Sequence, residues 1–251
     1  MKKHGNKNLL VYSLSLLILI SAAFFSPSCS LKSNKTIIRL QHLEEGVSSP
    51  TTVEEIKDAI AKYQNRVNDI QLANSQVGIW YKILGTRYLD TKMYGEALKA
   101  FQTAIQYYPV NQNLYYYIGV CAGYMAHAAL DYNATGSTAE RYNYLKLAES
   151  AYLRAIDLED TFVRALYGIG VLYVFELDEC EKAIPYLERL LTVDTKNTDA
   201  MFVLARAYYV EGEFKKAVNL YDSIVSITKS DVKKREAEAN KKTVLDASYT
   251  N

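Results

Sequence analysis

The most constraining feature of this sequence is a set of small residues that recurs at nearly constant spacing. One series has spacings of 34, 51 and 35 residues and consists of Gly85, Gly119, Gly170 and Ala205. A second series has spacings of 51, 35 and 34 residues and consists of Ala97, Ala148, Ala183 and Ala217. The two series agree if each unit is 34 residues long, with 17 extra residues after Gly119 and one after Gly170. A repeat of this length predicts a stack of two-helix units.

The first unit carries large and small residues in a fixed order. They are Tyr81, Leu84, Gly85, Tyr88, Ala97, Phe101, Ala104 and Pro109. This order resembles the tetratricopeptide repeat at every marked position of its signature. In such a hairpin Gly85 and Ala97 let the two helices approach closely, large side chains fill the surrounding space, and Pro109 ends the second helix.

The resemblance implies an all-α fold, a right-handed tetratricopeptide (TPR) superhelix or α-solenoid of about four helical hairpins. The hairpins are expected at residues 78–111, 112–162, 163–197 and 198–229. An insertion near 125–144 would lengthen both helices of the second hairpin around a turn at 133–137. Residues 51–77 are predicted to form a leading helix that begins at a Thr52–Glu55 capping box. Residues 230–251 are predicted to form a polar C-terminal capping helix and tail.

Residues 1–29 are predicted to be an export signal. Three lysines precede a charge-free apolar stretch at 9–25, which ends at Ser26-Pro27-Ser28-Cys29. This ending resembles a bacterial lipoprotein signal with Ser26 at a usually aliphatic position, and it implies lipidation of Cys29. Ordinary cleavage and an uncleaved anchor are the alternatives. Residues 30–50 would form a flexible tether, and the protein is expected to be exported and membrane-anchored in the cell envelope, facing the periplasm or in the outer membrane.

Composition and motifs give no indication of catalysis. Lysine plus arginine total 29 against 28 acidic residues, so no charge excess favours nucleic acid as a partner. Of the three histidines, only His127 lies within the repeats, and no other metal ligand stands at a suitable spacing. Cys121 and Cys180 are predicted to be buried structural thiols. We therefore expect no catalytic, cofactor or metal site and no enzyme activity.

In the family that the sequence resembles, the first helices of successive hairpins line a concave groove. The candidate partner-binding residues at these positions are Tyr116, Tyr117, Tyr124, Tyr167, Phe175, Phe202, Arg206 and Tyr209. Arg164 and Val174 also fall at groove positions. Such an aromatic lining suits an amphipathic helix, an extended apolar segment or a lipophilic ligand, whereas a clamp for a C-terminal carboxylate would need more lysine and asparagine. Alternatively, the leading helix or the insertion fills the groove, and these rings are core.

These features predict a membrane-anchored scaffold that binds a protein or peptide partner in the bacterial envelope. The alternative is a periplasmic ligand-binding or transporter-associated TPR lipoprotein, similar in layout to those that accompany tripartite ATP-independent transporters. A second alternative is a structural part in outer-membrane or peptidoglycan assembly. The projecting insertion would contact either a partner or another copy, and the sequence does not predict the oligomeric state.

Overall fold

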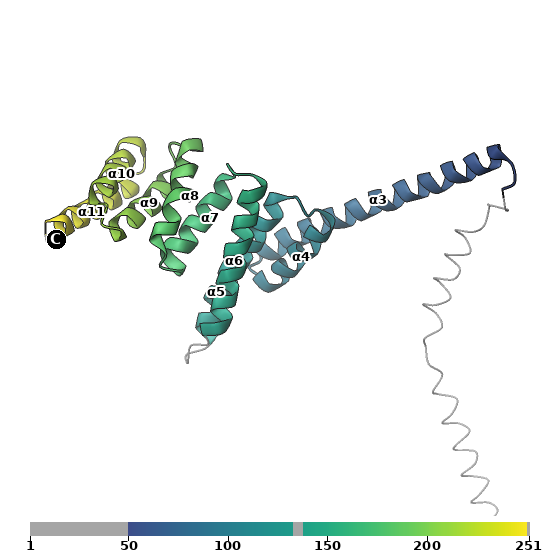
Figure 1. The fold of residues 1–251 in the computed structure, drawn as a ribbon. Helices are drawn as coiled ribbons and strands as arrows, with labels where there is room; N and C mark the ends of the chain where they lie inside the picture. The colour runs from purple at the N-terminus through teal and green to yellow at the C-terminus, as the bar shows by residue number, and fades with distance from the viewer. Residues whose placement is uncertain (1–49, 133–137, 250–251) are drawn as a thin grey trace, which may run out of the picture. The chain divides into compact units, whose positions relative to one another are not determined.

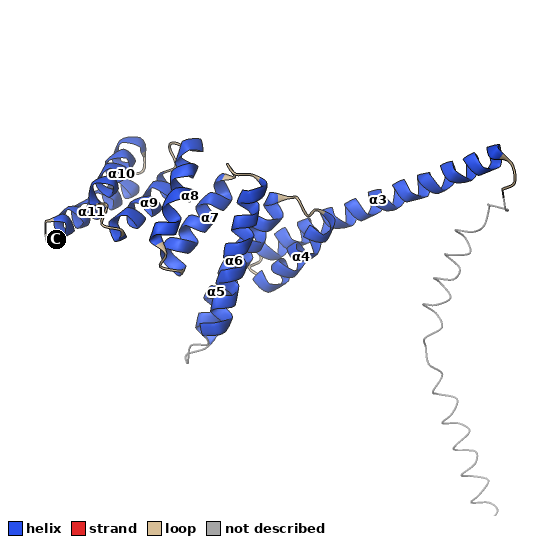
Figure 2. Cartoon of the chain, viewed as in Figure 1, coloured by secondary structure: helices blue, strands red, loops and turns tan. Residues whose placement is uncertain are grey.

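The computed structural model describes residues 50–132 and 138–249, and all regular structure in these ranges is helical (Figures 1 and 2). The chain divides into two compact units, residues 1–68 and residues 69–251. The predicted signal at 1–29, the tether up to residue 49 and the turn at 133–137 lie outside the described residues. Among the described helices, none combines the length and apolar character that a bilayer crossing requires.

In the first unit, the described structure is the beginning of helix α3 (Val53–Asp90). The backbone N–H of Glu55 donates to Thr52 Oγ1 at 3.2 Å, and the backbone N–H of Thr52 donates to Glu55 Oε2 at 3.0 Å. This reciprocal pair is the predicted capping box, which is thereby confirmed. The backbone donors of Thr52 and Thr51 hold the pKa of the Glu55 carboxyl below its usual range.

The predicted leading helix (51–77) and the first helix of hairpin one are continuous, because α3 runs through residues 77 and 78 without a break. No proline occurs in α3, and Gly78 keeps helical geometry. A Cβ on Gly78 would lie only 2.6 Å from Tyr107 Cβ. Gly78 therefore allows a neighbouring helix to approach closely rather than ending its own helix.

In the second unit, successive helices form antiparallel hairpins that pack in chain order (Figure 1). The second half of α3 contacts α4 (Tyr94–Tyr107), and α5 (Gln112–Tyr132) pairs with α6 (Thr138–Leu158). Helix α7 (Val163–Val171) continues as the π-helix η1 (Leu172–Glu176) and pairs with α8 (Cys180–Val193). Helix α9 (Thr198–Val210) pairs with α10 (Phe214–Ile227), and α11 (Asp231–Ser248) packs on α10. Helices α5 and α6 have 21 residues each, against 14 in α4, so the insertion lengthens both.

The recurrent small residues lie where the two helices of a hairpin touch. If a Cβ were added to Gly85, it would lie 2.7 Å from the Phe101 ring. A Cβ added to Gly170 would lie 2.5 Å from the Leu187 side chain. In hairpin two, a Cβ on Gly119 would lie 2.6 Å from the Tyr152 ring. The same contact thus recurs in hairpins one, two and three once the two insertions are removed. Close approach at these points requires a small residue, which explains the periodic pattern in the sequence.

The single extra residue of hairpin three is taken up by the π-helix. The backbone N–H of Leu177 donates to the Leu172 carbonyl at 3.1 Å, five residues earlier, as a π-helix requires. One added residue turns the following side chains by about 100° around the helix axis. Val174 is consequently buried, although the sequence register predicts it in the groove.

Two apolar clusters hold the hairpins together. The smaller joins α4, α5 and α6 around Phe101, Leu114 and Cys121, and the larger extends from α5 to α11. Cys121 and Cys180 are both buried, as predicted. Burial raises the pKa of the Cys121 thiol to about 12, so this thiol stays protonated and unreactive at neutral pH.

Candidate functional site

A cavity of about 290 Å³ opens between α5 and α7, the first helices of hairpins two and three. We call it the groove cavity. Helix α5 contributes Tyr116, Val120 and Tyr124, and helix α7 contributes Arg164, Tyr167 and Val171. These side chains recur every three or four residues, so each helix presents one face to the cavity. The lining is mainly aromatic and apolar, with charged groups at its two ends.

The floor of the groove cavity is the ring of Tyr152, which lies between two helices. A Cβ on Gly119 of α5 would lie 2.6 Å from this ring, and a Cβ on Gly168 of α7 would lie 2.7 Å from it. Burial raises the pKa of Tyr152 above its usual range. Gly123 also lines the cavity, but a Cβ there would meet no atom within 4 Å. Glycine at position 123 therefore leaves open space in the cavity.

One end of the groove cavity is marked by the guanidinium group of Arg164. Its Cζ lies 4.9 Å from the centre of the Tyr116 ring and 5.1 Å from that of Phe162. Arg164 also donates a hydrogen bond to the side-chain carbonyl of Asn113. Among the described residues, no carboxylate forms a salt bridge with Arg164. The aromatic contacts therefore fix the position of a cation whose charge is not neutralised by a carboxylate.

The other end is formed by Glu176, which the π-helix turns toward the cavity. Glu176 Oε2 accepts from Arg141 Nη2 at 2.8 Å, and Oε1 lies 3.1 Å from His127 Nε2. The Glu176 side chain is only 17% exposed, and Arg141 belongs to the insertion of hairpin two. This ion pair therefore connects the insertion to hairpin three and neutralises the negative end of the groove cavity.

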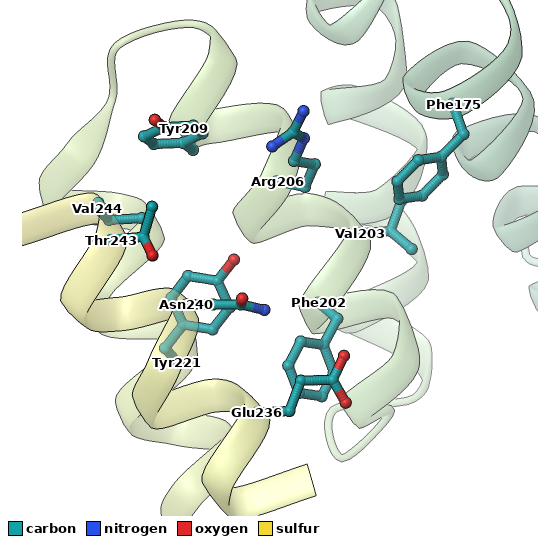
Figure 3. Close-up of a pocket in the computed structure, with 10 residues that line it drawn as sticks. All are labelled: Phe175, Phe202, Val203, Arg206, Tyr209, Tyr221, Glu236, Asn240, Thr243 and Val244. Carbon is teal, nitrogen blue, oxygen red and sulfur yellow. The ribbon is translucent and has the colours of Figure 1, made fainter. Parts of the chain in front are cut away.

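A second cavity, of about 310 Å³, lies at the C-terminal end of the array, and we call it the terminal cavity (Figure 3). Phe202, Arg206 and Tyr209 of α9 line one side of it. Asn240 and Thr243 of α11 lie across from them, as Figure 3 shows. The terminal cavity is thus a small space between α9 and the capping helix.

The predicted groove residues fall into three groups. Those in the groove cavity are Tyr116, Tyr124 and Tyr167. Those in the terminal cavity are Phe175, Phe202, Arg206 and Tyr209. Tyr117 lines neither cavity, because its ring stacks on Phe101 at 4.9 Å and packs between hairpins one and two. Tyr117 follows Tyr116 by about 100° around the helix, which is enough to turn it away from the groove cavity.

Part of the groove, at hairpin four, is filled by helix α11 of the protein itself. Ala237 and Val244 of α11 are buried in the larger apolar cluster. Lys233 Nζ of the same helix lies 2.7 Å from Asp199 Oδ1, at the start of α9. Helix α11 therefore covers the array at hairpin four, while the groove cavity at hairpins two and three is open.

Sequence reasoning did not place His127 and Glu176 in the groove. His127 follows Tyr124 by three residues and therefore lies on the same face of α5. The position of Glu176 depends on the one-residue insertion that forms the π-helix. The sequence indicates this insertion through the spacing of 35 residues between Gly170 and Ala205. Among the residues that the structure describes, no group of three or more His, Cys, Asp or Glu side chains could hold a metal ion.

Comparisons with known proteins agree with this architecture. A family model described as tetratricopeptide repeat matches residues 175–233. A curated relative, the TPR repeat-containing protein of Borreliella burgdorferi, is 24% identical over 211 residues, which is 82% of this chain and 88% of the relative.

Solved structures with a similar fold include two TPR proteins. TTC0263 of Thermus thermophilus has a TM-score of 0.52 at 16% identity, over 77% of this chain and 92% of that chain. YrrB, described as a TPR protein with an unusual peptide-binding site, has a TM-score of 0.51 at 21% identity, over 74% and 85% of the two chains. The predicted all-α TPR solenoid is confirmed, and residues 175–233 match the tetratricopeptide repeat family model.

Proposed function

We propose that this TPR protein is a membrane-anchored scaffold in the bacterial envelope, and that its groove cavity binds a segment of a partner protein. The TPR fold itself supports a role in protein–protein interaction. The description of YrrB as a peptide-binding TPR protein agrees with such a role for a related fold. The observation that carries the proposal is an open aromatic cavity with a positioned arginine at one end.

The chemistry of the groove cavity indicates what the partner segment contains. Tyr116 and Tyr167 are partly buried, and burial raises the pKa of both phenols, so these rings stay neutral over the physiological range. Their faces offer contact area to an apolar or aromatic side chain. Aromatic side chains that are already ordered lose little conformational entropy when a partner binds.

Charge further defines the orientation of the partner. Glu176 is neutralised by Arg141, whereas Arg164 has no carboxylate partner among the described residues. A carboxylate of the bound segment can therefore pair with Arg164 through a charge-assisted hydrogen bond. We infer that the partner segment places an apolar side chain between the tyrosines and an acidic group next to Arg164.

A small ligand is a less suitable occupant of this groove. The groove cavity and the terminal cavity measure about 290 and 310 Å³, near the lower limit for small-molecule sites, and they share no lining residue. A ligand-binding protein would need one continuous, enclosed cleft. A cavity of this size instead suits one side chain of a polypeptide that lies along the groove.

The test compares two variants of the full chain in pull-downs from detergent-solubilised native membranes. The first combines Tyr124→Ala with Arg164→Gln, which removes two exposed groups of the groove cavity. The control is Tyr142→Ala, which removes an equally exposed tyrosine on α6 that lines neither cavity. We expect the first variant to lose the partner and the control to retain it. Equal recovery by both would reject the groove cavity as the binding site.

The anchor is proposed separately, on the sequence ending at Cys29. A lipid on this residue would hold the scaffold at the membrane surface. Cells that express the wild type or a Cys29→Ser variant are labelled with a fatty-acid analogue, and their membranes are fractionated. Incorporation of label into the wild type alone supports lipidation. Labelling of neither protein, with both in the membrane fraction, would instead support an uncleaved anchor.

A further inference from the structure

The first half of α3 carries a stripe of exposed apolar side chains. The stripe consists of Val53, Ile56, Ile60, Tyr63, Val67 and Ile70. Each of these residues is between 39% and 67% exposed. Most large apolar side chains of a soluble helix pack against another element, so a stripe of this length indicates an interaction surface.

The spacing of this stripe alternates strictly between three and four residues, which defines heptad positions a and d. Val53, Ile60 and Val67 occupy position a, and Ile56, Tyr63 and Ile70 occupy position d. The next a position is Asn74, and the following d position is Val77, which is 38% exposed. A single asparagine at an a position is a feature that fixes the register and the number of strands of a coiled coil.

We propose that residues 53–77 form a parallel, two-stranded coiled coil with the same segment of a second copy of this chain. In a parallel pair, Asn74 faces Asn74 of the second copy, and the two amides can hydrogen-bond to each other. Arg66 at position g faces the neutral Gln71 at position e, so no like charges meet. The stripe is therefore complementary to itself in this orientation.

The antiparallel arrangement is disfavoured by the same residues. With the two segments fully overlapped, Arg66 would face Arg66, and Ile56 would pack against Asn74. The first contact places like charges together, and the second leaves an amide without a polar partner. The pattern thus selects a parallel pair over its reverse.

The area of the stripe is sufficient for a specific interface. Six side chains that are about half exposed would bury, on two copies, on the order of 1,000 Å² in total, which is the lower bound for a stable biological interface. The apolar stripe continues into Tyr81, which packs against the smaller apolar cluster of the hairpins. The coiled coil would therefore end where α3 begins to pack on its own hairpin.

Disulfide cross-linking of the full chain in detergent micelles tests the arrangement. Ile60→Cys places a thiol at position a, and Asp58→Cys places one at position f of the same heptad, facing away from the partner. Oxidation should give a dimer through Ile60→Cys at least tenfold faster than through Asp58→Cys or in the wild type. Equal rates for the two variants would overturn the proposal. A mixture of Ile60→Cys and Ile70→Cys distinguishes the orientation, because efficient heterodimer formation would indicate an antiparallel pair.

Sedimentation equilibrium supplies an independent measurement. A double variant, Ile60→Lys with Val67→Lys, changes only exposed side chains, so the hairpins should unfold at the same temperature as in the wild type. We expect this double variant to shift from dimer to monomer, with a dissociation constant at least tenfold weaker. An Asn74→Ile variant should still associate but lose its single oligomeric state. A monomeric wild type, or a dimer that the two lysines leave unchanged, would contradict the proposal.

Discussion

Replacement of Gly119 by alanine should destabilise the protein, although alanine is the better helix former. Removing glycine from a helix interior gains about 1 kcal/mol. The new Cβ would lie 2.6 Å from the Tyr152 ring, and Gly168 lies against the same edge of this ring, so the ring has little space to move. Overpacking of this kind costs about 1–3 kcal/mol, and a ring that contacts two helices favours the upper part of that range. The net effect is a loss of about 1–2 kcal/mol.

Gly123→Ala is the matched control, because Gly123 is in the same helix and a Cβ there meets nothing within 4 Å. This variant should gain about 0.5–1 kcal/mol from helix propensity alone. Urea unfolding followed by circular dichroism measures both variants against the wild type. If Gly119→Ala is as stable as Gly123→Ala, the close contact between α5 and Tyr152 is incorrect.

Three further predictions concern the core, the thiol and the ion pair. Leu187→Ala should lower the free energy of unfolding by about 3–5 kcal/mol, measured by denaturant unfolding, because Leu187 is fully buried against Gly170. The pKa of Cys121 is raised from 9.0 to about 12, so its contribution to stability is complete below pH 9 and is lost as the pH rises toward 12. The melting temperature of Cys121→Ala should therefore fall less between pH 9 and pH 12 than that of the wild type. An equal fall in melting temperature for the two proteins would contradict this prediction. Glu176→Gln should lower the free energy of unfolding by about 1–2 kcal/mol at low salt, because it leaves the half-buried Arg141 without its carboxylate, and an unchanged urea midpoint would exclude this contribution.

The hairpins were predictable because their central contact depends on residue size. Only a small residue allows the approach seen between Gly119 and Tyr152 or between Gly170 and Leu187, so the contact leaves a periodic trace in the sequence. The same trace gives the lengths of both insertions. Residue size does not, however, show whether an extra residue enters a loop or a helix.

The missed features of the groove follow from that ambiguity. The extra residue of hairpin three enters the helix as a π-turn, which buries Val174 and brings Glu176 to the groove cavity. The repeat register predicted Tyr117 in the groove beside Tyr116, whereas its ring stacks on Phe101 of hairpin one. The position of α11 depends on packing between elements that are far apart in the sequence, such as Lys233 with Asp199. Local patterns do not encode such contacts.

Site-specific photocrosslinking in living cells tests directly whether the groove cavity holds the partner. A photoreactive phenylalanine analogue replaces Tyr124 in the groove cavity or Tyr142 on the outer face of α6, two tyrosines that are 48% and 55% exposed. We predict that illumination cross-links a discrete protein partner from position 124 and not from position 142. Cross-linking of the same partner from position 142 alone would exclude the groove cavity and place the interaction on the outer face of hairpin two.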